Sequence, residues 1–178
     1  DFDLRPEGKN GALARTLEGY ATYYEKWSLT WEAQALLRAR PAVGSQELGE
    51  AFLKIGKPVR YPVALSAEDL REIRTLKARM ESERLPRGAN PRRHLKLGPG
   101  GITDTEWLVQ LLQLQYAHGI PELQTTSTLG ALRAAVNAKL IGQKEARHLI
   151  NAWQFASALR SAEKLWSGKA TDVLPEDR

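Results

Sequence analysis

Two aspartates at the head of the chain have the residue type and spacing to hold a metal ion. In "DFDLR", residues 1–5, polar and apolar residues alternate, so a strand would present Asp1 and Asp3 on one face. Such a carboxylate pair can bind Mg²⁺ and leave coordination positions open for phosphate oxygens. The same alternation is typical of a solvent-facing strand edge, where acids only add solubility. Arg5 would then contact a phosphate or simply neutralise the acids.

A glycine-rich stretch, "KLGPGGITDTE" at residues 96–106, is the second candidate site. Its glycines are Gly98, Gly100 and Gly101. Glycines before a helix leave backbone N–H groups free to bind a phosphate, and Lys96 would add a mobile cation. Asp104 and Glu106 lie in the first helical turn, where they would repel a bare phosphate. A magnesium-bridged nucleotide and a purely structural helix cap therefore both fit this pattern.

Two arginines in "LLRAR" form the third candidate. Arg38 and Arg40 follow an apolar helix face in the segment that begins at the acidic strand, so they are placed to reach a triphosphate. Ion pairs with Glu32 or Glu47 are the alternative.

Composition narrows the class of protein. The chain has 178 residues, 42% of them apolar, which suits one globular domain, or one domain and part of another. No apolar run is long enough for a membrane span or resembles a signal peptide, so we expect a cytoplasmic protein without a membrane partner. There is no cysteine, and the three histidines lack metal-ligand spacing, so any metal would have oxygen ligands.

The formal charge of +5 favours anionic partners. Acidic and basic residues interleave almost everywhere except in "PRRHLK", residues 91–96. That basic run lacks interleaved aromatic residues, so we expect no nucleic-acid partner.

The elements that must position these residues are mostly helices. Helical patterns cover residues 16–27, 30–40 and 46–55, the second with Thr30 as a possible N-cap. The prolines of "GKPVRYPVAL" indicate a domain boundary after residue 58.

Further helices are predicted after that boundary. A capping box at Ser66 and Asp69 opens a helix through roughly Arg84, and a second box, Thr103 to Glu106, opens another. Two more helices follow, the last one long. Five tryptophans are expected to pack in the core: Trp27, Trp31, Trp107, Trp153 and Trp166.

Four separated blocks of this sequence resemble the glutamine synthetase adenylyltransferase family. They are "DFDLRPEGKNG", "YYEKWSLTWEAQALLRAR", "HLKLGPGGITDTEWLVQLLQLQYA" and "DVLPED". Together they span nearly the whole chain in the family's order and are most similar to its C-terminal, adenylylating half. The resemblance implies transfer of AMP from ATP to a tyrosine hydroxyl of glutamine synthetase, with Mg²⁺ as cofactor.

The resemblance also implies roles for the candidate residues. Asp1 matches a third carboxylate that joins two aspartates of a Gly-Ser-Asp-x-Asp signature in binding magnesium or taking the tyrosine proton, whereas Asp3 occupies a more variable position. The chain is thus expected to begin inside a catalytic domain and to be incomplete for catalysis. Arg5, Arg38 and Arg40 are the expected phosphate contacts. The family's glycine-rich motif, inferred to face the nucleotide or to fix interdomain geometry, is matched by Lys96, Gly98, Gly100, Gly101, Asp104 and Glu106.

The sequence therefore predicts a mainly α protein. Residues 1–58 are expected to be the end of an α/β nucleotidyltransferase domain, and residues 59–178 a helical-bundle domain related to that of the uridylyltransferase acting on the nitrogen-regulatory signal protein. The expected partners are glutamine synthetase and that signal protein. A non-catalytic docking module is the alternative function. A uridylyltransferase is a third, to be separated by its preference for UTP over ATP.

Overall fold

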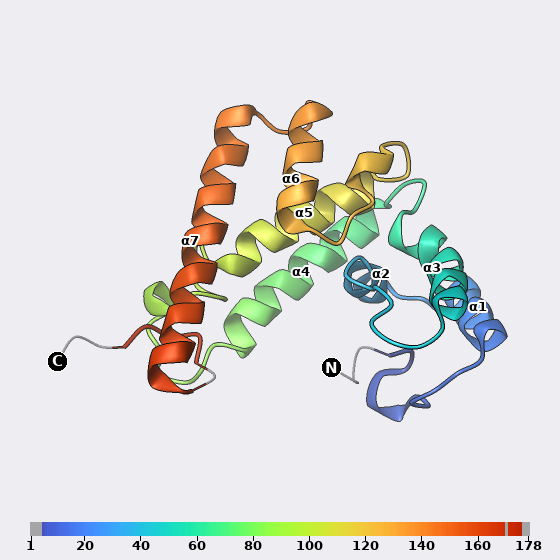
Figure 1. Cartoon of the computed structure of the whole chain (residues 1–178), viewed down its shortest axis with the longest axis horizontal. Helices are drawn as coiled ribbons and strands as arrows, with labels where there is room; N and C mark the ends of the chain where they lie inside the picture. Colours follow the sequence, from blue (N-terminus) through green and yellow to red (C-terminus); the bar gives the residue numbers. More distant parts are fainter. Residues whose placement is uncertain (1–4, 170, 176–178) are drawn as a thin grey trace. The chain divides into compact units, whose positions relative to one another are not determined.

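The computed structural model describes residues 5–169 and 171–175, and the described part is mainly α, as predicted (Figure 1). Its α-helices are α1 (Leu17–Lys26), α2 (Thr30–Leu36), α3 (Gln46–Arg60), α4 (Ala67–Glu83), α5 (Ile102–Tyr116), α6 (Thr128–Asn137) and α7 (Gln143–Ser167). Three short 3-10 turns accompany them: η2 (Gly8–Asn10), η3 (Pro91–Arg93) and η4 (Pro121–Leu123). Apart from Arg5, the strand predicted at residues 1–5 lies outside the described residues.

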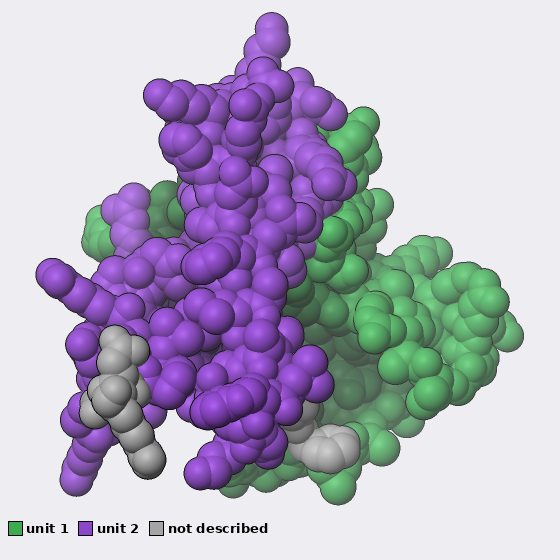
Figure 2. All heavy atoms as spheres, turned by 60° about the vertical axis from the view of Figure 1, so that its left-hand side comes forward, with its two compact units in different colours: residues 1–73, 110–127 green, residues 74–109, 128–178 purple. Residues whose placement is uncertain are grey.

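The chain forms two compact units, coloured separately in Figure 2. Unit 1 contains residues 1–73 and 110–127, and unit 2 contains residues 74–109 and 128–178. The domain boundary predicted after residue 58 stays a prediction. None of the helices in the described part is long and apolar enough to cross a membrane.

The packing of unit 1 centres on aromatic side chains between α1 and α3. The ring of Phe52 on α3 lies 5.0 Å from that of Tyr20 and 6.4 Å from that of Tyr24, both on α1, in edge-to-face geometry. Such aromatic pairs add to the stabilisation from buried area. α3 is therefore fixed against α1.

The start of α2 differs from the prediction. Thr30 is not its N-cap, because its hydroxyl donates a hydrogen bond of 2.8 Å to the Asp69 carboxylate instead. The Leu29 N–H donates to the buried Glu32 carboxylate at 2.9 Å, and so does the Tyr23 hydroxyl at 3.0 Å. α2 also ends at Leu36 rather than at residue 40.

α3 is longer than predicted. It begins after Ser45, whose hydroxyl accepts the Leu48 N–H at 3.2 Å, and it continues to Arg60 despite Pro58. A proline inside a helix removes one N–H donor and crowds the preceding turn, which is why the sequence favoured an end at residue 55. The Tyr61 N–H donates to the Lys57 carbonyl at 3.0 Å, so the turn after the proline is still closed.

The capping box of α4 is confirmed. The Ser66 hydroxyl accepts the Asp69 N–H at 3.0 Å, and the Asp69 carboxylate accepts the Ser66 N–H at 2.8 Å. Hydrogen bonds from Ser66 hold the pKa of Asp69 below its usual range. This reciprocal arrangement satisfies two of the free N–H groups at the helix start.

Within unit 2, α6 and α7 pack side by side (Figure 1). Small buried residues at their contact allow close approach, among them Ala135 on α6 and Ala146 on α7. The prediction that all five tryptophans pack in the core is wrong. Trp27 is 60% and Trp166 80% exposed, because the buried side of α7 runs through Ala146 and Ala156 and turns Trp166 outward.

Candidate functional site

Arg5, a predicted phosphate contact, is engaged by the loop that follows it. Its Nε donates to the Gly11 carbonyl at 2.8 Å and its Nη2 to the Lys9 carbonyl at 2.9 Å. A Cβ at Gly11 would lie 1.9 Å from the Pro6 carbonyl oxygen, so the loop closes tightly there. Arg5 thus organises residues 6–11, while Asp1 and Asp3 lie outside the described residues.

The glycines of residues 98–101 are needed for close backbone packing. A Cβ at Gly98 would lie 2.0 Å from the Pro91 carbonyl oxygen, and one at Gly101 would lie 2.8 Å from the Gly98 carbonyl oxygen. Gly100 has a φ of 75°, in the left-handed region that favours glycine. This geometry accounts for all three glycines without a ligand.

The N–H groups and charges of the loop are satisfied by its own neighbours. The Gly100 N–H donates to the Asp104 carboxylate at 2.7 Å, and Lys77 on α4 pairs with Asp104 at 2.6 Å. Burial alone would lower the pKa of Lys77, but its bonds to Asp104 and Glu81 raise it. A carboxylate therefore already occupies the position at Gly100 where a phosphate would bind.

The capping box predicted at Thr103 and Glu106 does not form. α5 begins at Ile102, so Thr103 lies in its first turn, and the Thr103 hydroxyl donates to the Lys96 carbonyl at 2.7 Å. The Asp104 carboxylate, in the first turn of α5, instead accepts the N–H of Gly100 ahead of the helix, which supports the structural interpretation of the loop that the sequence left open.

The loop is also fixed from the C-terminal side. The Leu95 N–H donates to the Asp172 carbonyl at 2.8 Å, and the Asp172 carboxylate pairs with Arg160 on α7. Burial by itself would raise the pKa of Asp172. The hydrogen bond and positive charge of Arg160 lower the pKa by more, so its net shift is downward. A cleft of about 430 Å³ lies beside these groups and includes Lys96 and His94 in its lining.

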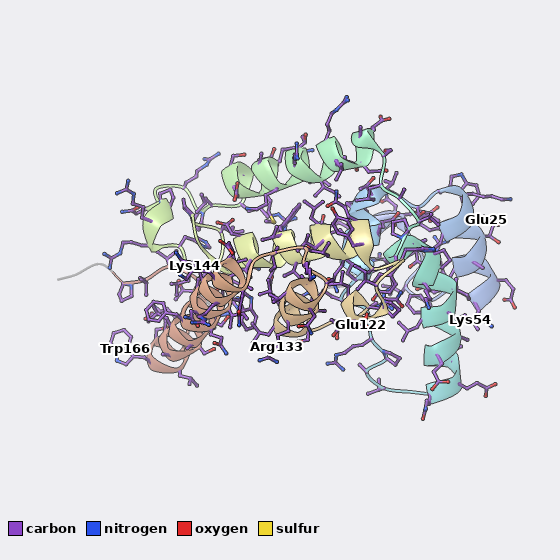
Figure 3. The ribbon with its side chains drawn as sticks, turned by 90° about the horizontal axis from the view of Figure 1, so that it is seen from above. Glu25, Lys54, Glu122, Arg133, Lys144 and Trp166 are labelled. Carbon is purple, nitrogen blue, oxygen red and sulfur yellow. The ribbon has the colours of Figure 1, made fainter. Side chains whose placement is uncertain are left out.

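A second cleft, of about 540 Å³, lies in unit 1; we call it the basic cleft. Its lining comprises Ala39, Arg40, Leu53, Lys54, Lys57, Arg60, Tyr61, Gln124, Thr125 and Thr126, with no Asp or Glu among these described residues. Lys54 projects from α3 in Figure 3. Of the two arginines predicted to reach a triphosphate, Arg40 lines the cleft, whereas exposed Arg38 donates to the Thr126 carbonyl at 3.4 Å.

Sequence reasoning missed the three basic residues that α3 contributes to this cleft: Lys54, Lys57 and Arg60. They are spaced by three, so a continuous helix places them on one side. The prolines after residue 55 had indicated that the helix ends there, which hid the spacing. The signal was present in "KIGKPVR" and needed only the longer helix.

The described residues contain no cluster of three metal-binding side chains. Within residues 5–169 and 171–175, no three His, Cys, Asp or Glu side chains are placed to hold a metal ion together. Asp104 and Asp172 are each neutralised by cations. The magnesium predicted at Asp1 falls outside the described residues.

Two family models of known proteins match the two parts of the chain. Residues 1–55 match a family model described as glutamate-ammonia ligase adenylyltransferase, and residues 71–178 match one described as GlnD PII-uridylyltransferase.

Curated relatives cover the whole chain. It is 54% identical to the bifunctional glutamine synthetase adenylyltransferase/adenylyl-removing enzyme of Streptomyces coelicolor, 52% to that of Leifsonia xyli and 54% to that of Mycobacterium marinum. These alignments cover 98 to 100% of this chain but 18% of each relative's length. Matched from end to end by these enzymes, the chain belongs to the family of bifunctional glutamine synthetase adenylyltransferase/adenylyl-removing enzymes.

Proposed function

We propose that this chain is part of the C-terminal, adenylylating half of a glutamine synthetase adenylyltransferase. That enzyme half moves AMP from ATP to a tyrosine hydroxyl of glutamine synthetase, and pyrophosphate leaves. The observation that carries the proposal is the identity of 52 to 54% over the full chain with enzymes of that name. The partners that follow from it are glutamine synthetase and the nitrogen-regulatory signal protein, and the compartment is the cytoplasm.

Positioning and charge neutralisation are what this chain's residues contribute in the proposal. Asp1 would help to hold a magnesium ion, which would supply charge neutralisation of the triphosphate, or Asp1 would accept the tyrosine proton. Asp3 is the nearby carboxylate in the sequence. Arg40 contacts phosphate oxygens, with Arg38 close to it in sequence; its place in the lining of a cleft without carboxylates supports that role. Arg5 acts by organising the loop at residues 6–11.

The glycine-rich motif has a positioning role in this proposal. Lys96, Gly98, Gly100, Gly101, Asp104 and Glu106 were expected to face the nucleotide or to fix interdomain geometry. The internal hydrogen bonds of the loop favour the second of these roles.

The decisive experiment uses a full-length enzyme that carries this sequence. Incorporation of labelled AMP into glutamine synthetase is measured for the parent, for Asp1→Asn and for Val43→Ser, a control at a 96% exposed position. We expect Asp1→Asn to lower the rate by about a hundredfold or more, as the loss of a metal ligand does, with unchanged thermal stability. Near-normal transfer by Asp1→Asn would remove that residue from the mechanism.

Nucleotide choice separates this proposal from a uridylyltransferase. Residues 71–178 match the uridylyltransferase model, but residues 1–55 match the adenylyltransferase model. We therefore expect the full-length enzyme to transfer from ATP and not from UTP. A preference for UTP would contradict the proposal.

Docking of a partner protein is the second candidate function, and exposed apolar residues on α7 favour it. Phe155, Leu165 and Trp166 are 71%, 86% and 80% exposed. Large exposed apolar residues gathered on one helix are typical of interaction sites. In the full-length enzyme, Phe155→Ser with Trp166→Ser should raise the KM for glutamine synthetase and leave kcat unchanged, whereas Val43→Ser should alter neither. An unchanged KM would argue against docking on α7.

A further inference from the structure

The basic cleft contains a buried cation that has no counter-charge. Arg60 is only 7% exposed, and among the residues that the structure describes none accepts a hydrogen bond from its side chain or forms an ion pair with it. Its contact is with the ring of Tyr61, whose centroid lies 5.1 Å from the guanidinium carbon. The Nε of Arg60 is buried without a hydrogen-bond partner, which is costly, and an anion in the cleft would compensate for it.

Three further cations surround the same space. Lys54, Lys57 and Arg40 line the cleft with Arg60, and within the described part of the chain none of the three is ion-paired. Lys54, Lys57 and Arg60 follow one another at spacings of three along α3, where like charges repel. The arrangement therefore destabilises the free helix and would be relieved by an anion.

The helix dipole accounts for only part of this cluster. Lys57 and Arg60 lie in the last turn of α3, where cations are favoured. The dipole does not explain the burial of Arg60 or the approach of Arg40, which comes from a different segment. It also gives no reason for the absence of carboxylates from the lining.

Another part of the cleft lining, residues 124–126, is held by side-chain hydrogen bonds. The buried Gln113 side chain donates to the Leu123 carbonyl at 2.7 Å and to the Thr125 carbonyl at 2.6 Å. The Gln124 side chain donates to the Ala117 carbonyl at 2.7 Å. Thr125 is thus positioned in advance, and the hydroxyl groups of Thr125 and Thr126 are of the kind that donate to phosphate oxygens.

We propose that the basic cleft binds a phosphate-class oxyanion through Arg60, Lys54 and Lys57, together with Arg40. Two guanidinium and two ammonium groups around one space match the several oxygens of a phosphate or polyphosphate. The oxyanion is either the polyphosphate chain of a nucleotide or free phosphate. The inference deepens the proposed function and rests on it where the oxyanion is a nucleotide polyphosphate, because that function already gives Arg40 of this cleft a phosphate contact. Its test needs no glutamine synthetase, so its failure can be told apart from failure of AMP transfer.

The test measures the binding of inorganic phosphate, pyrophosphate and magnesium-free ATP to the full chain by calorimetry. Arg60→Met removes the buried charge, and Lys57→Gln removes an exposed one with less risk to folding. Lys26→Gln is the matched control, because Lys26 is an exposed lysine of unit 1 on α1 that does not line the cleft. Circular dichroism checks that each variant remains helical.

We expect pyrophosphate to bind the parent chain and to bind Arg60→Met about tenfold or more weakly, the size of a lost charge-assisted hydrogen bond. Lys57→Gln should weaken binding by about threefold to tenfold, and Lys26→Gln should leave it unchanged. If Arg60→Met unfolds, Lys57→Gln decides alone.

The three anions identify the source of the oxyanion. If pyrophosphate and ATP bind more tightly than phosphate, and each variant loses the same affinity for both, the cleft is assigned to a nucleotide polyphosphate. If all three anions bind equally, the cleft is assigned to free phosphate. No binding to the parent chain, or equal binding to the parent, Lys57→Gln and Lys26→Gln, would overturn the proposal.

Discussion

The glycine-rich loop of unit 2 and the basic cleft of unit 1 differ in how their charges are satisfied. In the loop, the Asp104 carboxylate accepts the Gly100 N–H and pairs with Lys77. In the cleft, Arg60 is buried without a counter-charge among the described residues. The loop has the sequence pattern of a phosphate site, but its own carboxylate already satisfies its N–H group and its neighbouring cation. The cleft lacks a familiar sequence pattern but has the electrostatics of a phosphate site. Sequence likeness to a phosphate loop is therefore weaker evidence than an unmet charge.

The largest effect is expected when the packing of the loop is broken. Gly98→Ala would place a Cβ 2.0 Å from the Pro91 carbonyl oxygen, and the free energy of unfolding should fall by about 3 kcal/mol, as in overpacked cores. Urea unfolding measures this. The control is Gly119→Ala, where a Cβ meets nothing within 4 Å and φ is not positive, and it should be nearly neutral. Equal stability of the two variants would show that the loop is not close-packed.

A smaller effect should separate the loop's conformation from nucleotide binding. Gly100 has a φ of 75° but open space around it, so Gly100→Ala should cost about 1 kcal/mol from backbone strain alone. Its affinity for ATP, measured by calorimetry, should equal that of the parent chain. Weakened ATP binding with unchanged thermal stability would contradict the structural role of the loop.

Low pH should weaken the ion pair between Asp172 and Arg160, which holds the C-terminal segment beside the loop. The folded-state pKa of Asp172 is depressed, so the stability it contributes is present above the unfolded-state value of about 3.9 and is lost as the pH falls through the folded value. Asp172→Asn should therefore be less stable than the parent at about pH 6 and nearly equal to it at about pH 2. A constant difference between the two proteins across this range would exclude the linkage.

The smallest effect concerns the free cleft. Because Lys54 lies among like charges and, unlike Lys57 and Arg60, outside the last turn of α3, Lys54→Gln should raise the free energy of unfolding by about 0.3 kcal/mol without any anion present. The gain should shrink at high salt, which screens the repulsion. Thermal unfolding at two salt concentrations tests this, with Lys26→Gln as the control. Destabilisation by Lys54→Gln would mean that the cations are already compensated.

The sequence predicted much of the local structure where one interaction dominates. The capping box at Ser66 and Asp69 formed as expected, because both partners lie within four residues of each other. The end of α3 and the cap of α2 were wrong for a shared reason. Contacts distant in sequence, such as that of Thr30 with Asp69, outweigh local preference.

The candidate site was less predictable than the fold. The glycines of the loop were identified from the sequence. The reason why Gly98 and Gly101 must be glycine, their close approach to the carbonyl oxygens of residues 91–98, is visible only in the structure. Arg40 was singled out from the sequence. Lys54, Lys57 and Arg60 were missed because Pro58 indicated a helix end that the packing of α3 against α1 overrides.

The most direct test of the contrast between the two regions is a pyrophosphate titration of the full chain followed by the NMR shifts of its backbone amides. We predict saturable shifts at residues 39–40, 54–61 and 124–126, with residues 98–104 unaffected. Shifts confined to residues 98–104 would contradict the account and return the phosphate site to the glycine-rich loop.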